Sequence, residues 1–79
     1  MKDRIRIAPI AIADVAHPDL QAVGGTAYRA HLGTHLECLD VVVTDDTIAA
    51  SFGEYAVQGS YIAGDSLEQN VLRMATMAG

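Results

Sequence analysis

Residues 39–51 read Leu-Asp-Val-Val-Val-Thr-Asp-Asp-Thr-Ile-Ala-Ala-Ser, and this stretch predicts local structure more clearly than any other part of the chain. Its valines at 41–43 form a β-branched run that favours a strand, and residues 47–51 form a second strand-like run. Between the two runs, Asp45 and Asp46 are residue types that favour a turn. We therefore expect a β-hairpin at the centre of the fold.

The residues before this hairpin predict another strand and a loop. Residues 4–13 alternate bulky side chains with small or charged ones, which is the period of a strand. The alternation changes parity at Pro9, and proline cannot donate a hydrogen bond to a neighbouring strand, so we expect an edge or a bend there. Residues 14–25 carry turn formers and predict a loop, with at most one helical turn at 18–23.

Two backbone conformations fit residues 26–38. A helix capped by Thr26 would align four apolar side chains along one stripe, namely Tyr28, Leu32, Leu36 and Leu39. A strand would place His31, Gly33, His35 and Glu37 on one face instead. The sequence leaves both conformations open.

The residues after the hairpin predict one more strand and a helix. Residues 55–58 and 60–62 indicate a strand with a bulge at Gly59, while Ser66 begins a helix with Gln69 at the capping-box position. The apolar stripe of this helix comprises Leu67, Val71, Met74 and either Met77 or Ala78. We therefore expect a single small α+β domain over residues 1–79. It would contain an antiparallel sheet from the N-terminal strand and the central hairpin, a C-terminal helix and, in one interpretation, a helix at 26–38.

The composition predicts a thin hydrophobic core. Of 79 residues, 51% are hydrophobic, but only 5% are aromatic and thirteen are alanine. A chain of this length gains little more from apolar burial than it loses in conformational entropy. We therefore expect a non-catalytic assembly or binding protein, which buries its sheet edge and its Ala/Met-rich terminal helix against copies of itself or a larger protein partner.

The charge balance bears on which partners are expected. Ten acidic residues against five basic ones give a net charge of −5, so the clustered cations that bind phosphates are missing. We expect no direct binding to nucleic acid. An acidic inhibitor, for instance a virus-encoded one, which occupies a basic groove on a nucleic-acid enzyme is a third hypothesis for the function.

Cysteine content and hydropathy bear on the compartment. Cys38 is the one cysteine, so no disulfide can form within the chain, and its apolar neighbours predict a buried, inert thiol. The N-terminal region lacks a continuous apolar stretch of signal-peptide length, and no segment approaches a membrane span. We expect no signal peptide and no membrane association, and a cytoplasmic or virion-associated location.

One short motif predicts metal chemistry. Residues 31–37, His-Leu-Gly-Thr-His-Leu-Glu, place His31, His35 and Glu37 at a spacing that suits one divalent ion in either conformation. In a strand or loop all three side chains point the same way. In a helix, Cys38 would join the two histidines in place of Glu37. Nitrogen and oxygen ligands suit Zn²⁺ or Mn²⁺, and a metal-bound water would support hydrolysis. Without such a site we expect no cofactor, and the same residues would then form a polar pair or a pH-sensitive contact between copies.

The motif resembles the H-x-G-T-H-x-D-x-P signature of the metal-dependent cyclase and kynurenine formamidase family, whose members hydrolyse amide-like bonds. The resemblance covers seven residues and implies that His31 and His35 are metal ligands. It places Glu37 where the family has an aspartate ligand, and Leu39 where the family has a proline. A metal-dependent hydrolase-like or metal-stabilised domain is therefore the second hypothesis.

Overall fold

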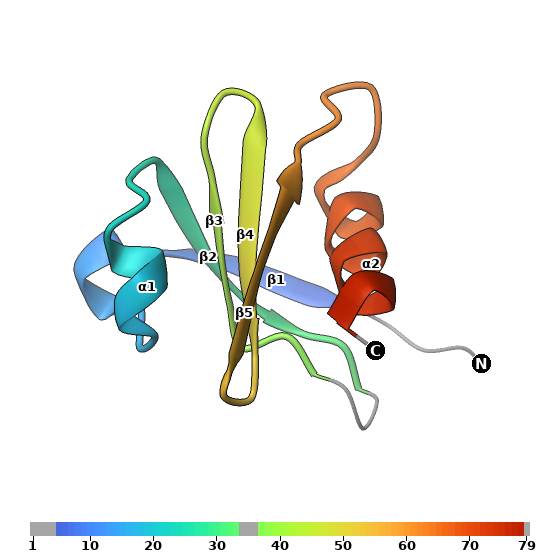
Figure 1. Ribbon diagram of the computed structural model, residues 1–79. Coiled ribbons are helices and arrows are strands. Elements are labelled where there is room, and N and C mark those ends of the chain that lie inside the picture. Colours follow the sequence, from blue (N-terminus) through green and yellow to red (C-terminus); the bar gives the residue numbers. More distant parts are fainter. Residues whose placement is uncertain (1–4, 34–36, 79) are drawn as a thin grey trace.

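Five strands form one open antiparallel sheet in the computed structural model, which describes residues 5–33 and 37–78 (Figure 1). They are β1 (Arg6–Ile10), β2 (Thr26–His31), β3 (Asp40–Val43), β4 (Thr47–Phe52) and β5 (Tyr55–Ser60). Each strand pairs with its neighbours in sequence, so β1 and β5 are the two edges. The predicted α+β class, with its antiparallel sheet and C-terminal helix, is confirmed.

The predicted central hairpin is formed by β3 and β4. Val42 pairs with Ala49 in its register, and the Thr44 N–H donates to the Thr47 carbonyl at 2.9 Å to close the turn. A second tight hairpin follows, in which Phe52 pairs with Tyr55. Gly53 adopts φ +64° in this turn, a conformation that glycine reaches without steric cost. The chain therefore runs through β3, β4 and β5 as a continuous meander.

Residues 26–31 are extended, which decides between the two conformations predicted for residues 26–38. Strand β2 pairs with β1 on one side and with β3 on the other, as in the pairs of Ala30 with Ile7 and of Tyr28 with Val41. The helix interpretation is therefore wrong for the described part of this range. Pairing on both sides satisfies the backbone groups of β2, and this tertiary effect outweighs the helical spacing of the apolar residues.

Helix α2 (Leu67–Ala78) packs on one face of the sheet, called here the α2 face. Its predicted cap is present, because Ser66 Oγ accepts a hydrogen bond from the Gln69 N–H at 3.1 Å. Val71 and Met74 are buried against the sheet. Gly59 pairs regularly with Ile48, so the predicted bulge is wrong. A side chain at Gly59 would begin 3.3 Å from Met74 Sδ, so glycine at this position allows α2 to approach β5 closely.

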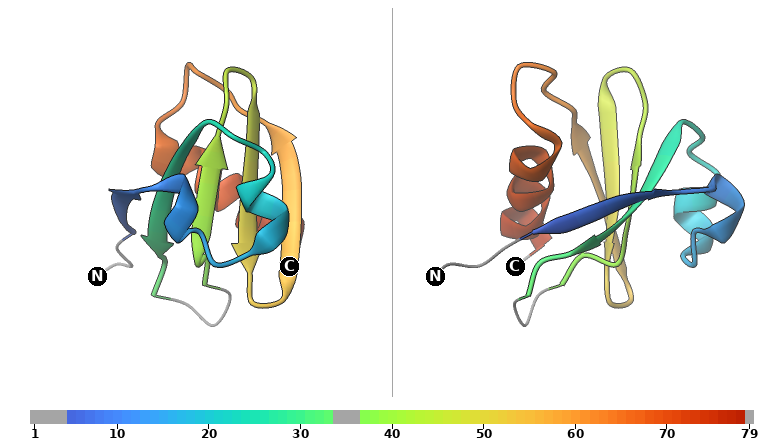
Figure 2. Two further views of the ribbon diagram at one scale, coloured as in Figure 1. Left: turned by 90° about the vertical axis from the view of Figure 1, so that its left-hand side faces the viewer. Right: turned by 180° about the vertical axis from the view of Figure 1, so that it is seen from behind.

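The opposite face of the sheet is covered by the connection between β1 and β2 (Figure 2). This connection contains a short 3₁₀ turn, η1 (Ile12–Asp14), and helix α1 (Pro18–Gln21), in agreement with the predicted loop and its single helical turn. Val15 and Leu20 from the connection are buried against Val42 and Ala49. The face is called the α1 face below. Neither described helix is long and apolar enough to cross a membrane.

Candidate functional site

The predicted metal-binding motif lies where the chain leaves β2 and returns to β3. His31 is the last residue of β2, and its Nε2 atom lies 3.2 Å from Glu37 Oε2. Both side chains are partly exposed, at 55% and 34%. His35 lies outside the described residues, and the described ones contain no cluster of three or more His, Cys, Asp or Glu. The structure thus brings two of the three predicted ligands together, and the complete site remains a prediction.

Cys38 belongs to the core and not to this motif. The residue is fully buried, packs in the cluster beneath α2, and donates from Sγ to the Asp40 carbonyl at 3.5 Å. Burial, and then the negative charge of Asp40, raise the pKa of the Cys38 thiol to about 12. The predicted burial of this thiol is confirmed, and its inertness stays a prediction. The helix that would place Cys38 on the histidine face is wrong for residues 26–31, which are a strand, and Cys38 packs in the core.

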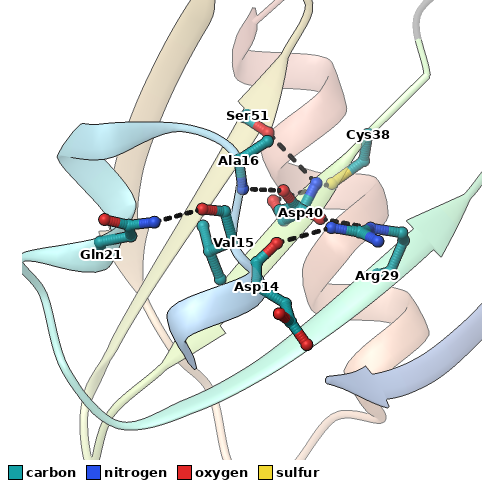
Figure 3. Close-up of polar contacts among 8 residues, drawn as sticks. All are labelled: Asp14, Val15, Ala16, Gln21, Arg29, Cys38, Asp40 and Ser51. Carbon is teal, nitrogen blue, oxygen red and sulfur yellow. Dashed lines mark hydrogen bonds and ion pairs between the residues drawn. The ribbon is translucent and has the colours of Figure 1, made fainter. Parts of the chain in front are cut away.

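A buried carboxylate organises the α1 face (Figure 3). Asp40 is 1% exposed; its Oδ1 accepts from Arg29 Nε at 2.8 Å and its Oδ2 accepts from the Ala16 N–H at 2.9 Å. Arg29 Nη2 also donates to the Asp14 carbonyl at 2.9 Å. These contacts attach the β1–β2 connection to the middle of the sheet. Because both carboxylate oxygens have protein partners, the role of Asp40 here is structural.

His17, Asp40 and Ser51 line a pocket of about 170 Å³ on this face, but they do not form a catalytic arrangement. The Ser51 hydroxyl oxygen accepts the Asp40 N–H at 3.1 Å, while the His17 ring nitrogens face the Asp19 N–H and the Glu54 carbonyl. A nucleophilic serine requires a hydrogen bond to its base. The His17 ring instead caps the start of α1 and contacts the turn between β4 and β5.

The outer edge of β5 is the more informative surface. Tyr61, next to β5, donates its N–H to the Asp46 carbonyl at 3.0 Å, so odd-numbered residues turn their backbone groups toward β4. By the alternation of an antiparallel pair, Ala56, Gln58 and Ser60 turn their N–H and C=O groups outward. These three residues are exposed, and β5 is an edge strand of the described sheet, at the right-hand side of Figure 2 (left). We call this row of backbone groups the open edge.

Both faces beside the open edge offer apolar contacts. On the α1 face, a groove of about 430 Å³ runs between α1 and the last two strands, with Leu20, Val23 and Ala56 among its lining residues. On the α2 face, Tyr55 is 71% exposed and Met77 is 56% exposed, with the Met77 sulfur close to Gly59. A strand added to β5 would therefore find contacts for side chains of both orientations.

The opposite edge of the sheet is different. The Ala30 N–H bonds to the Leu39 carbonyl, so even-numbered β2 residues face β3 and odd-numbered ones face β1. Pro9 pairs with Tyr28 and consequently directs its nitrogen outward, where it has no proton to donate. The charged, exposed side chain of Arg6 begins the same strand. Proline and charge are the usual devices that keep an edge strand from pairing.

Comparisons with protein-family models, with curated proteins and with solved structures find no match for this chain.

Proposed function

We propose that this protein is a non-catalytic binding module that takes an extended strand of a protein partner onto the open edge. One observation carries the proposal: Ala56, Gln58 and Ser60 turn backbone groups outward that pair with no other described residue, on a strand without charge or proline. Exposed groups of this kind pair readily with another strand, which is how several peptide-binding domains recognise their ligands. The outer edge of β1 is called here the guarded edge, because Pro9 and Arg6 oppose strand pairing there. The two edges therefore differ, and the edge of β5 is the one that can accept a strand.

The surroundings of the open edge indicate the chemistry of the partner strand. Alternate side chains would enter the groove beside α1 or would cover Tyr55 and Met77 on the α2 face. The contacts on the α2 face are apolar, whereas the groove beside α1 also presents Asp19 and Gln58. Because the chain carries a net charge of −5, a strongly acidic partner would be repelled. We therefore expect the partner strand to be uncharged or weakly basic, with apolar side chains toward the α2 face and small or polar side chains toward the groove.

A displayed library of short extended peptides tests this proposal. Gln58→Pro removes one outward N–H, as Pro9 does in β1, whereas Gln58→Thr keeps it and serves as the matched control. We expect selected peptides to perturb the amide resonances of residues 56–60, and to bind Gln58→Pro about tenfold or more weakly than Gln58→Thr, a difference of about 1.4 kcal/mol. Circular dichroism checks that both variants fold. A library that yields no binder at β5, or equal affinities of folded variants, would contradict the proposal.

The contact between His31 and Glu37 favours a second candidate function. A metal-stabilised or metal-dependent hydrolase-like domain would use His31, His35 and Glu37 as ligands for Zn²⁺ or Mn²⁺, supported by the 3.2 Å approach of His31 Nε2 to Glu37 Oε2. We expect stoichiometric zinc in the purified protein, a higher melting temperature with zinc, and loss of both in His35→Ala. His17→Ala is the matched control for removal of a histidine. Absence of stoichiometric metal would end this proposal.

A further inference from the structure

We propose that the partner strand is β5 of a second copy, paired antiparallel about a two-fold axis at Gln58, so that two sheets join into one. The inference rests on the proposed function, because it requires the open edge to accept a strand. It adds the identity of the occupant and the register of pairing. Both follow from the sequence and orientation of residues 55–61.

The register follows from which backbone groups face outward. With Gln58 opposite Gln58 of the second copy, Ala56 lies opposite Ser60 of the second copy, and Ser60 lies opposite its Ala56. These are the residues whose N–H and C=O groups have no backbone partner among residues 5–33 and 37–78 of one copy. In an antiparallel ladder, residues opposite one another in such positions exchange both hydrogen bonds. This register therefore satisfies every group of the open edge in both copies.

The side chains of β5 complement each other in the same register. On the α2 face, Val57 comes opposite Gly59 of the second copy, so a branched side chain lies beside a position that has none. Tyr55, 71% exposed in one copy, comes opposite Tyr61 of the second copy, and aromatic pairs across strands are favourable. On the α1 face, Gln58 lies opposite Gln58 of the second copy, and the two side-chain amides can hydrogen-bond to each other. The strand is therefore complementary to itself.

Charge does not oppose this pairing, although each copy carries a net charge of −5. The six residues of β5 are all uncharged. Glu54, the acidic residue just before the strand, would lie about 27 Å from Glu54 of the second copy, at about 3.4 Å per residue. That separation exceeds the Debye length of about 8 Å at physiological ionic strength. The two Glu54 carboxylates therefore lie at opposite ends of the interface.

Variants that introduce a charge at Gln58 test whether the two-fold axis passes through this residue. Gln58→Glu and Gln58→Lys each place like charges opposite one another, so sedimentation equilibrium should show each variant as a monomer at concentrations where the unmodified chain is a dimer. An equimolar mixture of the two should form a heterodimer. Gln58 is exposed, so both variants are expected to keep their fold, which circular dichroism checks. Ala8→Glu, on the guarded edge, should leave the dimer unchanged.

Engineered cysteines test the register in a Cys38→Ala background. Opposed residues of a hydrogen-bonded pair lie about 5.5 Å apart at Cα, within the range of a disulfide. Ala56→Cys and Ser60→Cys should therefore cross-link when mixed under mild oxidation, and neither should cross-link alone. Efficient cross-linking of Ala56→Cys with itself would overturn this register.

The outcomes separate this inference from the proposed function. A chain that stays monomeric at millimolar concentration while peptides bind at β5 would overturn the second copy as the partner and leave the binding module intact. A monomer that also binds no peptide at β5 would overturn both. Dimers that survive in Gln58→Glu and in Gln58→Lys would place the interface elsewhere and overturn the inference.

Discussion

The two edges of the sheet are built from strands of similar length but differ in what they offer to another chain. In β1, Pro9 occupies an outward position and lacks a donor, and Arg6 adds an exposed charge. In β5, Ala56, Gln58 and Ser60 occupy the outward positions, and all of them carry an N–H. One edge is therefore closed to strand pairing and the other is open.

This difference indicates that another strand is expected to pair with β5 and not with β1. Open edges carry a risk of aggregation, and natural proteins usually block them. A chain that blocks one edge and leaves the other free, with apolar contacts on both faces beside it, has a single surface for strand addition among its described residues. A single such surface favours a closed complex, whereas two would favour open-ended growth.

The largest effect is expected from ionising the core that lies between the two edges. The pKa of the buried Cys38 thiol is raised from an ordinary value of 9.0 to about 12, so the folded chain retains a proton that the unfolded chain loses. The contribution of this thiol to the free energy of unfolding is therefore fully present below about pH 9. It falls by roughly 1.4 kcal/mol per pH unit as the pH rises from 9 toward 12. Urea unfolding at several pH values should show this slope, and Cys38→Ala should show a smaller one. Equal slopes would contradict the burial of the thiol.

Loss of the Asp40 carboxylate is expected to weaken the guarded side of the sheet more than the open side. Asp40→Ala removes a buried carboxylate that accepts from the Ala16 N–H and from the Arg29 guanidinium, and should lower the free energy of unfolding by about 2–3 kcal/mol. Amide exchange should rise first in residues 14–16, which Asp40 and Arg29 hold against the sheet. Asp45→Ala in the exposed turn is the control, with a change within about 0.5 kcal/mol. Faster exchange confined to β4 and β5 would count against this assignment.

A methyl group at Gly59 is expected to disturb the open edge from its α2 face. The added Cβ would lie 3.3 Å from Met74 Sδ, so Gly59→Ala should lower the free energy of unfolding by about 1 kcal/mol. It should also weaken dimer formation, because Val57 of the second copy would lose its space. Gly64→Ala is the matched control, since its Cβ meets nothing within 4 Å. Thermal melts and sedimentation that do not distinguish the two variants would contradict the close approach of α2 to β5.

Opening the guarded edge should have the smallest effect on stability and a clear effect on assembly. Pro9→Thr restores an outward N–H, with a change in unfolding free energy within about 0.5 kcal/mol. Light scattering should then show species larger than a dimer, because both edges accept strands. Ala8→Thr, whose backbone groups face β2, should remain a dimer. Identical scattering from the two variants would mean that Pro9 does not guard the edge.

Local sequence patterns predicted most of the fold. The valine run before Asp45 and Asp46, the alternation through Pro9, and the cap at Ser66 each depend on neighbouring residues, and the structure contains the corresponding hairpin, edge strand and helix. Residues 26–31 could not be decided in this way, because their extended state depends on pairing with strands distant in sequence. The role of Gly59 was misassigned for the same reason, since the residue that requires glycine there is Met74 of α2.

The candidate site was predictable only in part. The expectation that a sheet edge would serve as a contact surface was available from the thin core, but strand order decides which strand is the second edge, and no local pattern encodes strand order. The contacts of Asp40 with Arg29 and Ala16 were also missed, because they join three segments of the chain. The signal that could have suggested them is an acidic residue at the start of a buried β-branched run.

Amide hydrogen exchange at residues 56, 58 and 60, followed as the protein concentration is raised, tests the central claim most directly. The outward amides of β5 should exchange rapidly in dilute solution and become protected as the second strand pairs with them, while the Ile7 amide at the guarded edge should be unaffected. Protection at Ile7 without protection in β5, or rapid exchange of the β5 amides in an associated species, would show that the open edge is not the surface through which this chain binds.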